Sequence, residues 1–151
     1  MAESAPRLFV HRRVITWSDS DPAGIAYTGQ FPNFALQAID AWFIDRLGMD
    51  WFEQHEKLGG GTPFVHVSMD FRSPLRPRDE VDTTVALAKA GRTSLEFRIS
   101  GRKADGTLSY EGRFVCVFVE AATGRPRPAP AQFTEAIARE AALAKSLLTP
   151  A

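Results

Sequence analysis

The residues most suited to take part in a reaction lie in one polar stretch, "WSDSDPAGIAYTG", at residues 17–29. It places Asp19 and Asp21 at the junction between an apolar alternating run and a helical pattern. Pro22 has a fixed φ angle, and Gly24 permits a sharp bend and a close approach to a ligand. Together they can turn the chain so that the Asp21 carboxylate is directed back towards the start of the helix.

A carboxylate in that position can act as a nucleophile or as a general base. It can attack a carbonyl carbon directly, or it can deprotonate a water molecule that attacks instead. The N–H groups at a helix N-terminus carry partial positive charge and can stabilise the oxyanion that forms. Taken alone, these residues favour an ordinary capped loop, because Asp, Pro and Gly are also common turn residues. Asp19 is expected to be structural, accepting hydrogen bonds from backbone N–H groups of the turn.

Other reactive side chains do not form a recognisable catalytic or metal-binding pattern. Ser18 and Ser20 lack the G-x-S-x-G context of a serine hydrolase. The three histidines and the single cysteine have no metal-ligand spacing, so no metal and no cofactor are expected. Each histidine is expected to lie on the surface or in the core. For His66, a position facing a pocket is an alternative. Cys116 lies in an apolar run and is interpreted as core packing.

Length and charge restrict the class of protein. The 151 residues suit a single domain over 1–151, and 44% apolar residues indicate a globular chain. A formal net charge of zero gives no electrostatic footprint for nucleic acid or for an anionic membrane surface. No stretch approaches the ~18 apolar residues of a membrane span, and no signal-peptide pattern begins the chain. The cytoplasm is the expected location.

The first half of the chain predicts a strand and two helices. "LFVHRRVITW" (8–17) has strand character, and from Phe31 the apolar residues recur with helical spacing up to a stop at Gly48. Asn33 is the expected N-cap. Apolar residues lie on nearly every face of this helix, which predicts a central position with burial nearly all round. A short second helix follows, with Asp50 and Glu53 at capping-box spacing and "GGG" at its end.

The second half predicts four strands, at 64–73, 80–90, 93–103 and 107–120, and a last helix at 132–148. Short turns join these strands, including the hairpin signal Asp105-Gly106, and short turns imply antiparallel pairing. Gly112 is expected to mark a bulge or a close approach. The fold class is therefore α+β, with an antiparallel sheet of about five strands curled around one long helix. Such a sheet leaves an outer surface and free edges, so a dimer or a larger assembly is expected.

The order of elements, together with "DSDPAGIAYTGQF" and "FRSPLRPRDEV", resembles the hotdog-fold acyl-CoA thioesterases, nearest to the 4-hydroxybenzoyl-CoA thioesterase-like branch. The likeness extends over residues 9–137. It implies a hotdog fold and hydrolysis of an acyl-CoA, with an aromatic or medium acyl group, to the free acid and CoA. It also implies homodimers with sites at the subunit interface, and a tetramer as the assembly.

The resemblance assigns roles to individual residues. Asp21 matches the catalytic carboxylate, and the backbone N–H groups of Thr28 and Gly29 match the oxyanion-binding position. Thr62 in "GGTPF" matches an active-site threonine, and Arg92 in "AGRTS" falls where the family places basic residues near the CoA phosphates. At Leu36 the 4-hydroxybenzoyl enzyme has an acidic residue that contacts the ring hydroxyl of its substrate, so this departure favours a different acyl group.

The remaining assignments concern the acyl pocket. Tyr27 and Phe31 are candidates to line it, with packing against the sheet as the alternative for both. Gly24 is expected to let the backbone approach the substrate. Other functions stay open at this point: hydrolysis of acyl-carrier-protein thioesters or of a naphthoyl-CoA, a dehydratase, and a non-catalytic domain that only binds acyl-CoA.

Overall fold

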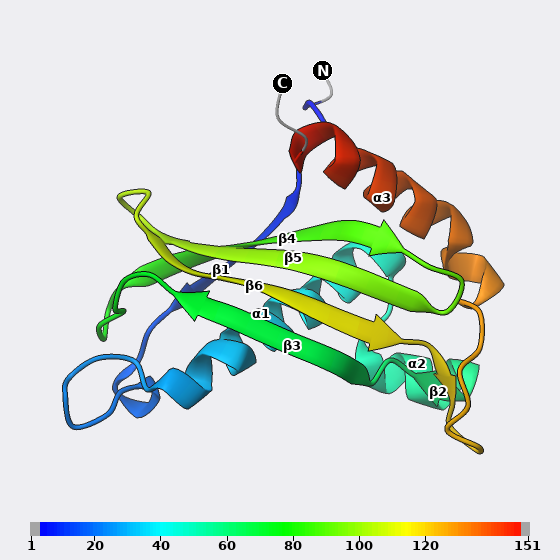
Figure 1. Ribbon diagram of the computed structural model, residues 1–151, viewed down its shortest axis with the longest axis horizontal. Coiled ribbons are helices and arrows are strands. Elements are labelled where there is room, and N and C mark those ends of the chain that lie inside the picture. Colours follow the sequence, from blue (N-terminus) through cyan, green and yellow to red (C-terminus); the bar gives the residue numbers. More distant parts are fainter. Residues whose placement is uncertain (1–3, 149–151) are drawn as a thin grey trace.

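A five-stranded antiparallel sheet dominates the computed structural model, which describes residues 4–148 (Figure 1). The strand order is β1-β4-β5-β6-β3, so β1 and β3 are the two edges. A separate pair joins β2 to β7. The bounds are β1 Phe9–Val14, β2 Gly60–Gly61, β3 Phe64–Phe71, β4 Glu80–Ala90, β5 Ser94–Lys103, β6 Leu108–Val117 and β7 Val119–Glu120.

One helix, α1, lies behind the sheet in Figure 1 and faces its inner surface. It continues through a π-helical turn and ends at Gly48, whose φ is +81°. The rings of Trp42 and Phe43 both pack on Phe97 of β5, with centroids 5.0 and 6.1 Å apart. The expected α+β hotdog arrangement is thereby confirmed. The helices are α1 Phe31–Trp42, the π-turn Phe43–Leu47, α2 Trp51–Leu58 and α3 Thr134–Leu148, with short 3-10 turns η1 Trp17–Asp19, η2 Thr28–Gln30 and η4 Ala131–Phe133.

Two expectations about α1 are wrong. The N-cap is Gln30 and not Asn33, because η2 runs directly into a helix that has Pro32 in its first turn. Asn33 instead donates from its side chain to Gln30 at 3.0 Å. Burial is also one-sided, since Ile44 in the π-turn is 51% exposed. The sheet covers only one side of α1, and the opposite side is left for solvent or a partner.

Local turn chemistry is confirmed at three places. The Asp50 side chain accepts from the N–H of Glu53 at 2.7 Å and caps α2. Gly106 has a φ of +88°, as the hairpin between β5 and β6 requires. Gly112 marks a close approach, because a Cβ on it would lie 2.5 Å from the carbonyl oxygen of Ser68.

Two strand expectations need correction. The predicted strand 107–120 is interrupted at Phe118, which is buried, and the chain then leaves the main sheet to form β7. The short connection between the strands predicted at 64–73 and 80–90 does not make them neighbours. Instead β3 pairs with β6, and β4 pairs with β1 and β5. The connection passes across the end of the sheet, where the N–H of Arg78 donates to the carbonyl of Ile15 at 2.7 Å.

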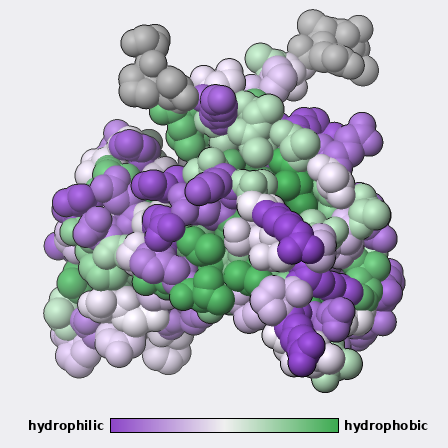
Figure 2. Space-filling view, turned by 45° about the vertical axis from the view of Figure 1, so that its right-hand side comes forward, coloured by the Kyte–Doolittle hydropathy of each residue, from purple (hydrophilic) through white to green (hydrophobic). Residues whose placement is uncertain are grey.

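The edge strand β3 exposes apolar side chains on one face and the polar side chains of His66, Ser68 and Asp70 on the other. Val65, Val67 and Phe71 are 65%, 45% and 48% exposed. Elsewhere, apolar patches also lie among hydrophilic residues on the surface in Figure 2. Helix α3 packs along β4, and within residues 4–148 no helix has the length and apolar character needed to cross a bilayer.

Candidate active site

The loop between β1 and α1 is a tight turn. Ser20 and Ala26 form an antiparallel bridge at its base. Inside it, the N–H of Gly24 donates to the carbonyl of Asp21 and the N–H of Asp21 donates to the carbonyl of Ile25, both at 2.9 Å. Gly24 has a φ of +79°, in the left-handed region that other residues rarely adopt. The sharp bend expected at this glycine is therefore present.

The Asp21 side chain is half-buried at the start of this turn. Its Oδ1 accepts a hydrogen bond from the N–H of Ala23 at 2.8 Å, which orients the carboxylate. Within residues 4–148 its Oδ2 has no hydrogen-bond partner. One oxygen is therefore held by the turn, and the other is left for solvent or a ligand.

The helical run that follows begins close to this carboxylate in the chain. The N–H groups of Thr28 and Gly29 are the first two of η2, so no helix carbonyl can accept from them. Both residues are exposed. Because η2 continues into α1, the partial positive charge of the helix terminus lies at these donors. They can stabilise negative charge on an incoming carbonyl oxygen.

Asp19 connects the two parts of this region. It is 3% exposed, and its carboxylate accepts from the N–H of Thr16 at 2.9 Å, from the Thr16 hydroxyl and from Arg13 at 3.0 Å. Burial alone would raise the pKa of Asp19, but the bonds from Thr16 and Arg13 outweigh it and hold that pKa below its usual value. The carbonyl of Asp19 accepts from the N–H of Tyr27 at 2.8 Å. The structural role expected for Asp19 is confirmed.

Arg13 is a residue that the sequence interpretation missed. In strand β1 it alternates with exposed Arg12 and Val14 and so shares the inner face with Phe9 and His11, a pattern that was visible in the sequence. Burial, and next the charge of Arg13, lower the pKa of His11.

The two aromatic candidates have different surroundings. Tyr27 is 57% exposed, and its ring packs so closely over Gly29 that a Cβ there would collide with it. Phe31 is 5% exposed, and its ring contacts those of Phe71 and Tyr110 at 4.9 and 5.5 Å. Tyr27 is thus accessible from solvent beside Gly29, whereas Phe31 forms part of the core.

Thr62 and Arg92 lie at the other end of the sheet. Thr62 follows β2, its side chain is buried, and its hydroxyl has no hydrogen-bond partner among the described residues. Arg92 is exposed in the turn between β4 and β5. In Figure 1 the loop that carries Asp21 lies at the opposite end from α2 and β2. A single chain therefore does not bring Thr62 beside Asp21.

Leu36 lies on α1, half-buried against the core. One turn further on, the Asp40 side chain accepts from the N–H of Trp51 at 3.2 Å, which ties α1 to α2. Burial raises the pKa of Asp40; the bond from Trp51 opposes this rise, and the charge of Asp50 adds to it.

Cys116, His66 and His55 lie away from the loop that carries Asp21. Cys116 is fully buried, and burial raises the pKa of its thiol to about 12, so it stays protonated and packs in the core as expected. His66 lies exposed on β3 beside Ser68, and His55 is exposed on α2. Among residues 4–148, no three His, Cys, Asp or Glu side chains are grouped to hold a metal ion.

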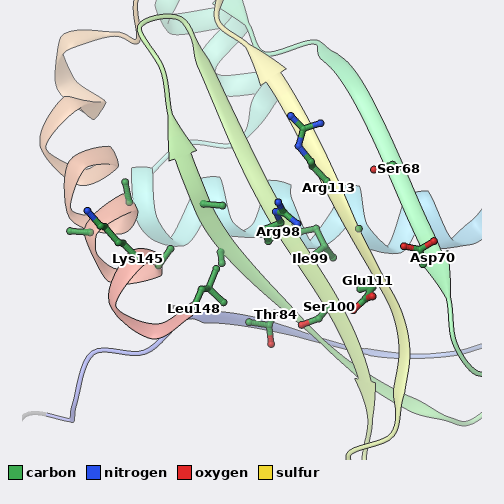
Figure 3. A pocket seen from close by; sticks show the side chains of 16 residues that line it. Ser68, Asp70, Thr84, Arg98, Ile99, Ser100, Glu111, Arg113, Lys145 and Leu148 are labelled. Carbon is green, nitrogen blue, oxygen red and sulfur yellow. The ribbon is translucent and has the colours of Figure 1, made fainter. Parts of the chain in front are cut away.

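A wide cavity lies away from Asp21, between α3 and the outer face of the sheet (Figure 3). Its volume is about 1060 Å³. Much of its charge is already paired within the sheet: Arg113 binds Glu96 at 2.7 Å, and Glu111 accepts from Arg72 at 2.9 Å. This cavity has neither the helix start nor the loop carboxylate that acyl transfer needs.

Comparison with known proteins identifies relatives over nearly the whole length. The sequence pattern of the thioesterase-like superfamily matches residues 15–137. A crystal structure of a thioesterase superfamily protein from Jannaschia sp. CCS1 is 38% identical, with a TM-score of 0.83 over 93% of this chain and 97% of that one. A 1,4-dihydroxy-2-naphthoyl-CoA hydrolase from Synechocystis is 27% identical over 130 residues, which are 82% of this chain and 91% of the relative.

A protein from Staphylococcus aureus, solved in complex with CoA, shares the fold. It has a TM-score of 0.88 at 17% identity, over 99% of this chain and 94% of that one.

Proposed function

The chain belongs to the thioesterase-like superfamily and is a thioester hydrolase, and from this premise we propose that its substrate is an aromatic acyl-CoA. The whole chain would act as a single domain. Asp21 supplies the attacking or proton-accepting carboxylate, and the N–H groups of Thr28 and Gly29 hold the oxyanion. The observation that carries the proposal is the link through Asp19, whose carbonyl accepts from Tyr27 at 2.8 Å and so holds the carboxylate loop against the helix start.

The chemistry at this site has two routes. In one, the carboxylate oxygen of Asp21 attacks the thioester carbon, CoA leaves as the thiolate, and water then cleaves the resulting mixed anhydride. In the other, Asp21 takes a proton from a water molecule that attacks instead. Both routes place negative charge on the carbonyl oxygen, where one oxyanion donor is worth ~3–4 kcal/mol. Single turnover in ¹⁸O-labelled water tests for the first route, because attack of water on the aspartyl carbon of the anhydride leaves label in Asp21, whereas the second route never labels the protein.

An aromatic acyl group is supported by the relatives and by the residues near the helix start. The Synechocystis relative acts on a bicyclic aromatic acyl-CoA. Here Tyr27 offers an exposed ring beside Gly29, and Leu36 offers an apolar side chain on the same helix. Leu36 cannot bind a ring hydroxyl, so the substrate need not carry the 4-hydroxyl group of the family's 4-hydroxybenzoyl enzyme.

The complete site needs two copies of the chain. The eight residues of β3 span ~25 Å, with Thr62 just before one end and Phe71, packed on Phe31 at the start of α1, at the other. Antiparallel pairing of two β3 edges would carry Thr62 of one copy to the Asp21 loop of its partner. The unpaired edge and the exposed side chains of Val65 and Val67 support this dimer. A tetramer would then be a pair of such dimers.

The test is release of free thiol from benzoyl-CoA, 1,4-dihydroxy-2-naphthoyl-CoA and a medium-chain fatty acyl-CoA. We expect an aromatic substrate to have the highest kcat/KM. We expect Asp21→Asn to lower kcat by ~10²–10⁴-fold, because the amide keeps the bond from Ala23 but neither attacks nor accepts a proton. A carrier-protein thioester hydrolysed faster than any CoA ester would instead support the carrier-protein alternative.

The matched control is Asp105→Asn. Asp105 also lies in a turn and accepts a hydrogen bond from the N–H two residues later, at 2.9 Å from Thr107. Its substitution removes a turn carboxylate without touching the site, and activity should stay at the wild-type level. Equal activity of Asp21→Asn and Asp105→Asn would refute the role of Asp21, and binding of acyl-CoA with no turnover by the wild type would indicate a non-catalytic domain.

A further inference from the structure

Arg13 extends from strand β1 under the sheet and contacts three separate groups. Its Nη2 donates to Asp19 Oδ1 at 3.0 Å, and its Nη1 donates to the side-chain oxygen of Gln37. Its guanidinium carbon lies 4.4 Å from the centre of the Phe34 ring. Only 23% of the Arg13 side chain is exposed. A charge buried to this degree is costly unless its partners compensate for the lost water, and here Nη1 and Nη2 are bonded while the buried Nε has no partner among the described residues.

The partners of Arg13 belong to the two segments that build the site. Asp19 lies two residues before Asp21, and its carbonyl accepts from the N–H of Tyr27, the residue before Thr28. Gln37 lies on α1, the helix whose start supplies the oxyanion donors. Arg13 therefore joins the carboxylate loop to the body of that helix through a planar, forked side chain, which can bind two acceptors at fixed angles.

We propose that Arg13 is a positioning residue that fixes the Asp21 loop relative to the N–H groups of Thr28 and Gly29. The proposal rests on the proposed function of this site. Arg13 need not touch the substrate: its effect passes through Asp19 and Gln37. We call the bonds from Arg13 to Asp19 and Gln37 the clamp. Loss of the clamp leaves Asp21 and the helix start in place in the sequence, but lets the loop and the helix move independently.

The experiment compares Arg13→Met with Arg12→Met. Arg12 is the adjacent residue of the same strand, and it also forms a two-point ion pair, with Asp82 at 2.8 and 3.0 Å, but on the outer face. We expect Arg13→Met to lower kcat by ~10–100-fold with little change in KM, since small misplacement of reacting groups has effects of this size. Arg12→Met should keep both constants. Arg13→Lys, which keeps the charge but not the fork, should restore only part of kcat.

Amide exchange gives a readout that does not depend on turnover. Exchange at residues 20–29 should be faster in Arg13→Met than in Arg12→Met, while the N–H groups of β5 and β6 stay equally protected in both. If wild-type protein hydrolyses no thioester, the proposed function fails, yet the exchange comparison still tests the clamp. If both variants fold and lose kcat equally, or if exchange of the loop is unchanged, the clamp is refuted. If Arg13→Met does not fold, Arg13→Lys and Gln37→Leu provide the same comparison against Arg12→Met.

Discussion

Subunit complementation tests whether the site lies between two chains. The perturbation is a mixture of two variants, Asp21→Asn and Thr62→Val, each inactivated at one end of the sheet. In a dimer paired through β3, a mixed pair has one site with both substitutions and one site with neither. If each site instead lay within one chain, every site would carry one of the two substitutions, so mixing would restore nothing.

The expected signal can be calculated. We take ~10-fold loss for Thr62→Val, the value of about one lost hydrogen bond, and complete loss for Asp21→Asn. After refolding together at equal concentrations, random pairing makes half of the dimers mixed, and the mixture should recover about 28% of wild-type activity. A site within one chain predicts about 5%, the mean of the two parents.

The assay is thiol release before and after joint refolding, with separately refolded and then mixed proteins as the control. Thr62→Val is a mild change for the fold, because its buried hydroxyl has no partner among the described residues and its loss leaves no acceptor or donor unpaired. Recovery near 5% after refolding, with dimers present by light scattering, would refute the shared site. Full activity of Thr62→Val alone would refute the role of Thr62.

Two further perturbations test the packing and the charges. Gly101→Ala should lower the free energy of unfolding by ~1–3 kcal/mol in denaturant titration, because its Cβ would lie 2.6 Å from Cε2 of Tyr110. The control is Gly61→Ala, whose Cβ would meet nothing within 4 Å and which should change the stability much less. Glu96→Gln should weaken the loss of stability in acid. The hydrogen bond from Arg113 lowers the pKa of Glu96 below its usual 4.5. The ion pair therefore stabilises the fold above pH 4.5, and this contribution is lost as the pH falls through the lowered pKa of the folded state. With Arg113 40% exposed, the change should stay below ~1 kcal/mol, and an unchanged acid-unfolding curve would contradict it.

Local chemistry explains which elements the sequence predicts. The hairpin at Gly106, the cap at Asp50 and the helix end at Gly48 each depend on residues within five positions of one another, so spacing alone reveals them. The turn at Gly24 is predictable for the same reason. The turn beside a helix start drew attention to Asp21, whereas the roles of Asp21, Thr28 and Gly29 in catalysis were assigned by the resemblance to the hotdog-fold thioesterases.

The order of the strands and the partners of individual side chains cannot be predicted from the spacing of nearby residues. The short connection before β4 favours pairing with β3, yet β3 binds β6 and forms the edge opposite β1. Because every pair is antiparallel, β1 and β3 run in the same direction, so Asp21 after β1 and Thr62 before β3 lie at opposite ends of the sheet. Arg13 has the same difficulty: its alternation places it on the inner face, but its bond to Gln37 depends on how α1 crosses the sheet, 24 residues later in the chain.

A comparison of two turns in this chain distinguishes the contacts that a turn requires from the additional contacts at the candidate site. At residues 21–25 and 103–107 the backbone makes the same two hydrogen bonds, with a glycine of positive φ in the fourth position and an aspartate that accepts from a nearby N–H. The hairpin turn reverses the chain with these devices and one further bond, from the exposed side chain of Arg102 to the carbonyl of Gly106 at 3.0 Å. The turn at Asp21 adds an ion pair between Asp19, 3% exposed, and Arg13. A buried ion pair contributes little net stability, because removing two charges from water offsets most of their attraction. Chain reversal does not require that cost, whereas holding a carboxylate at a fixed distance from a helix start does.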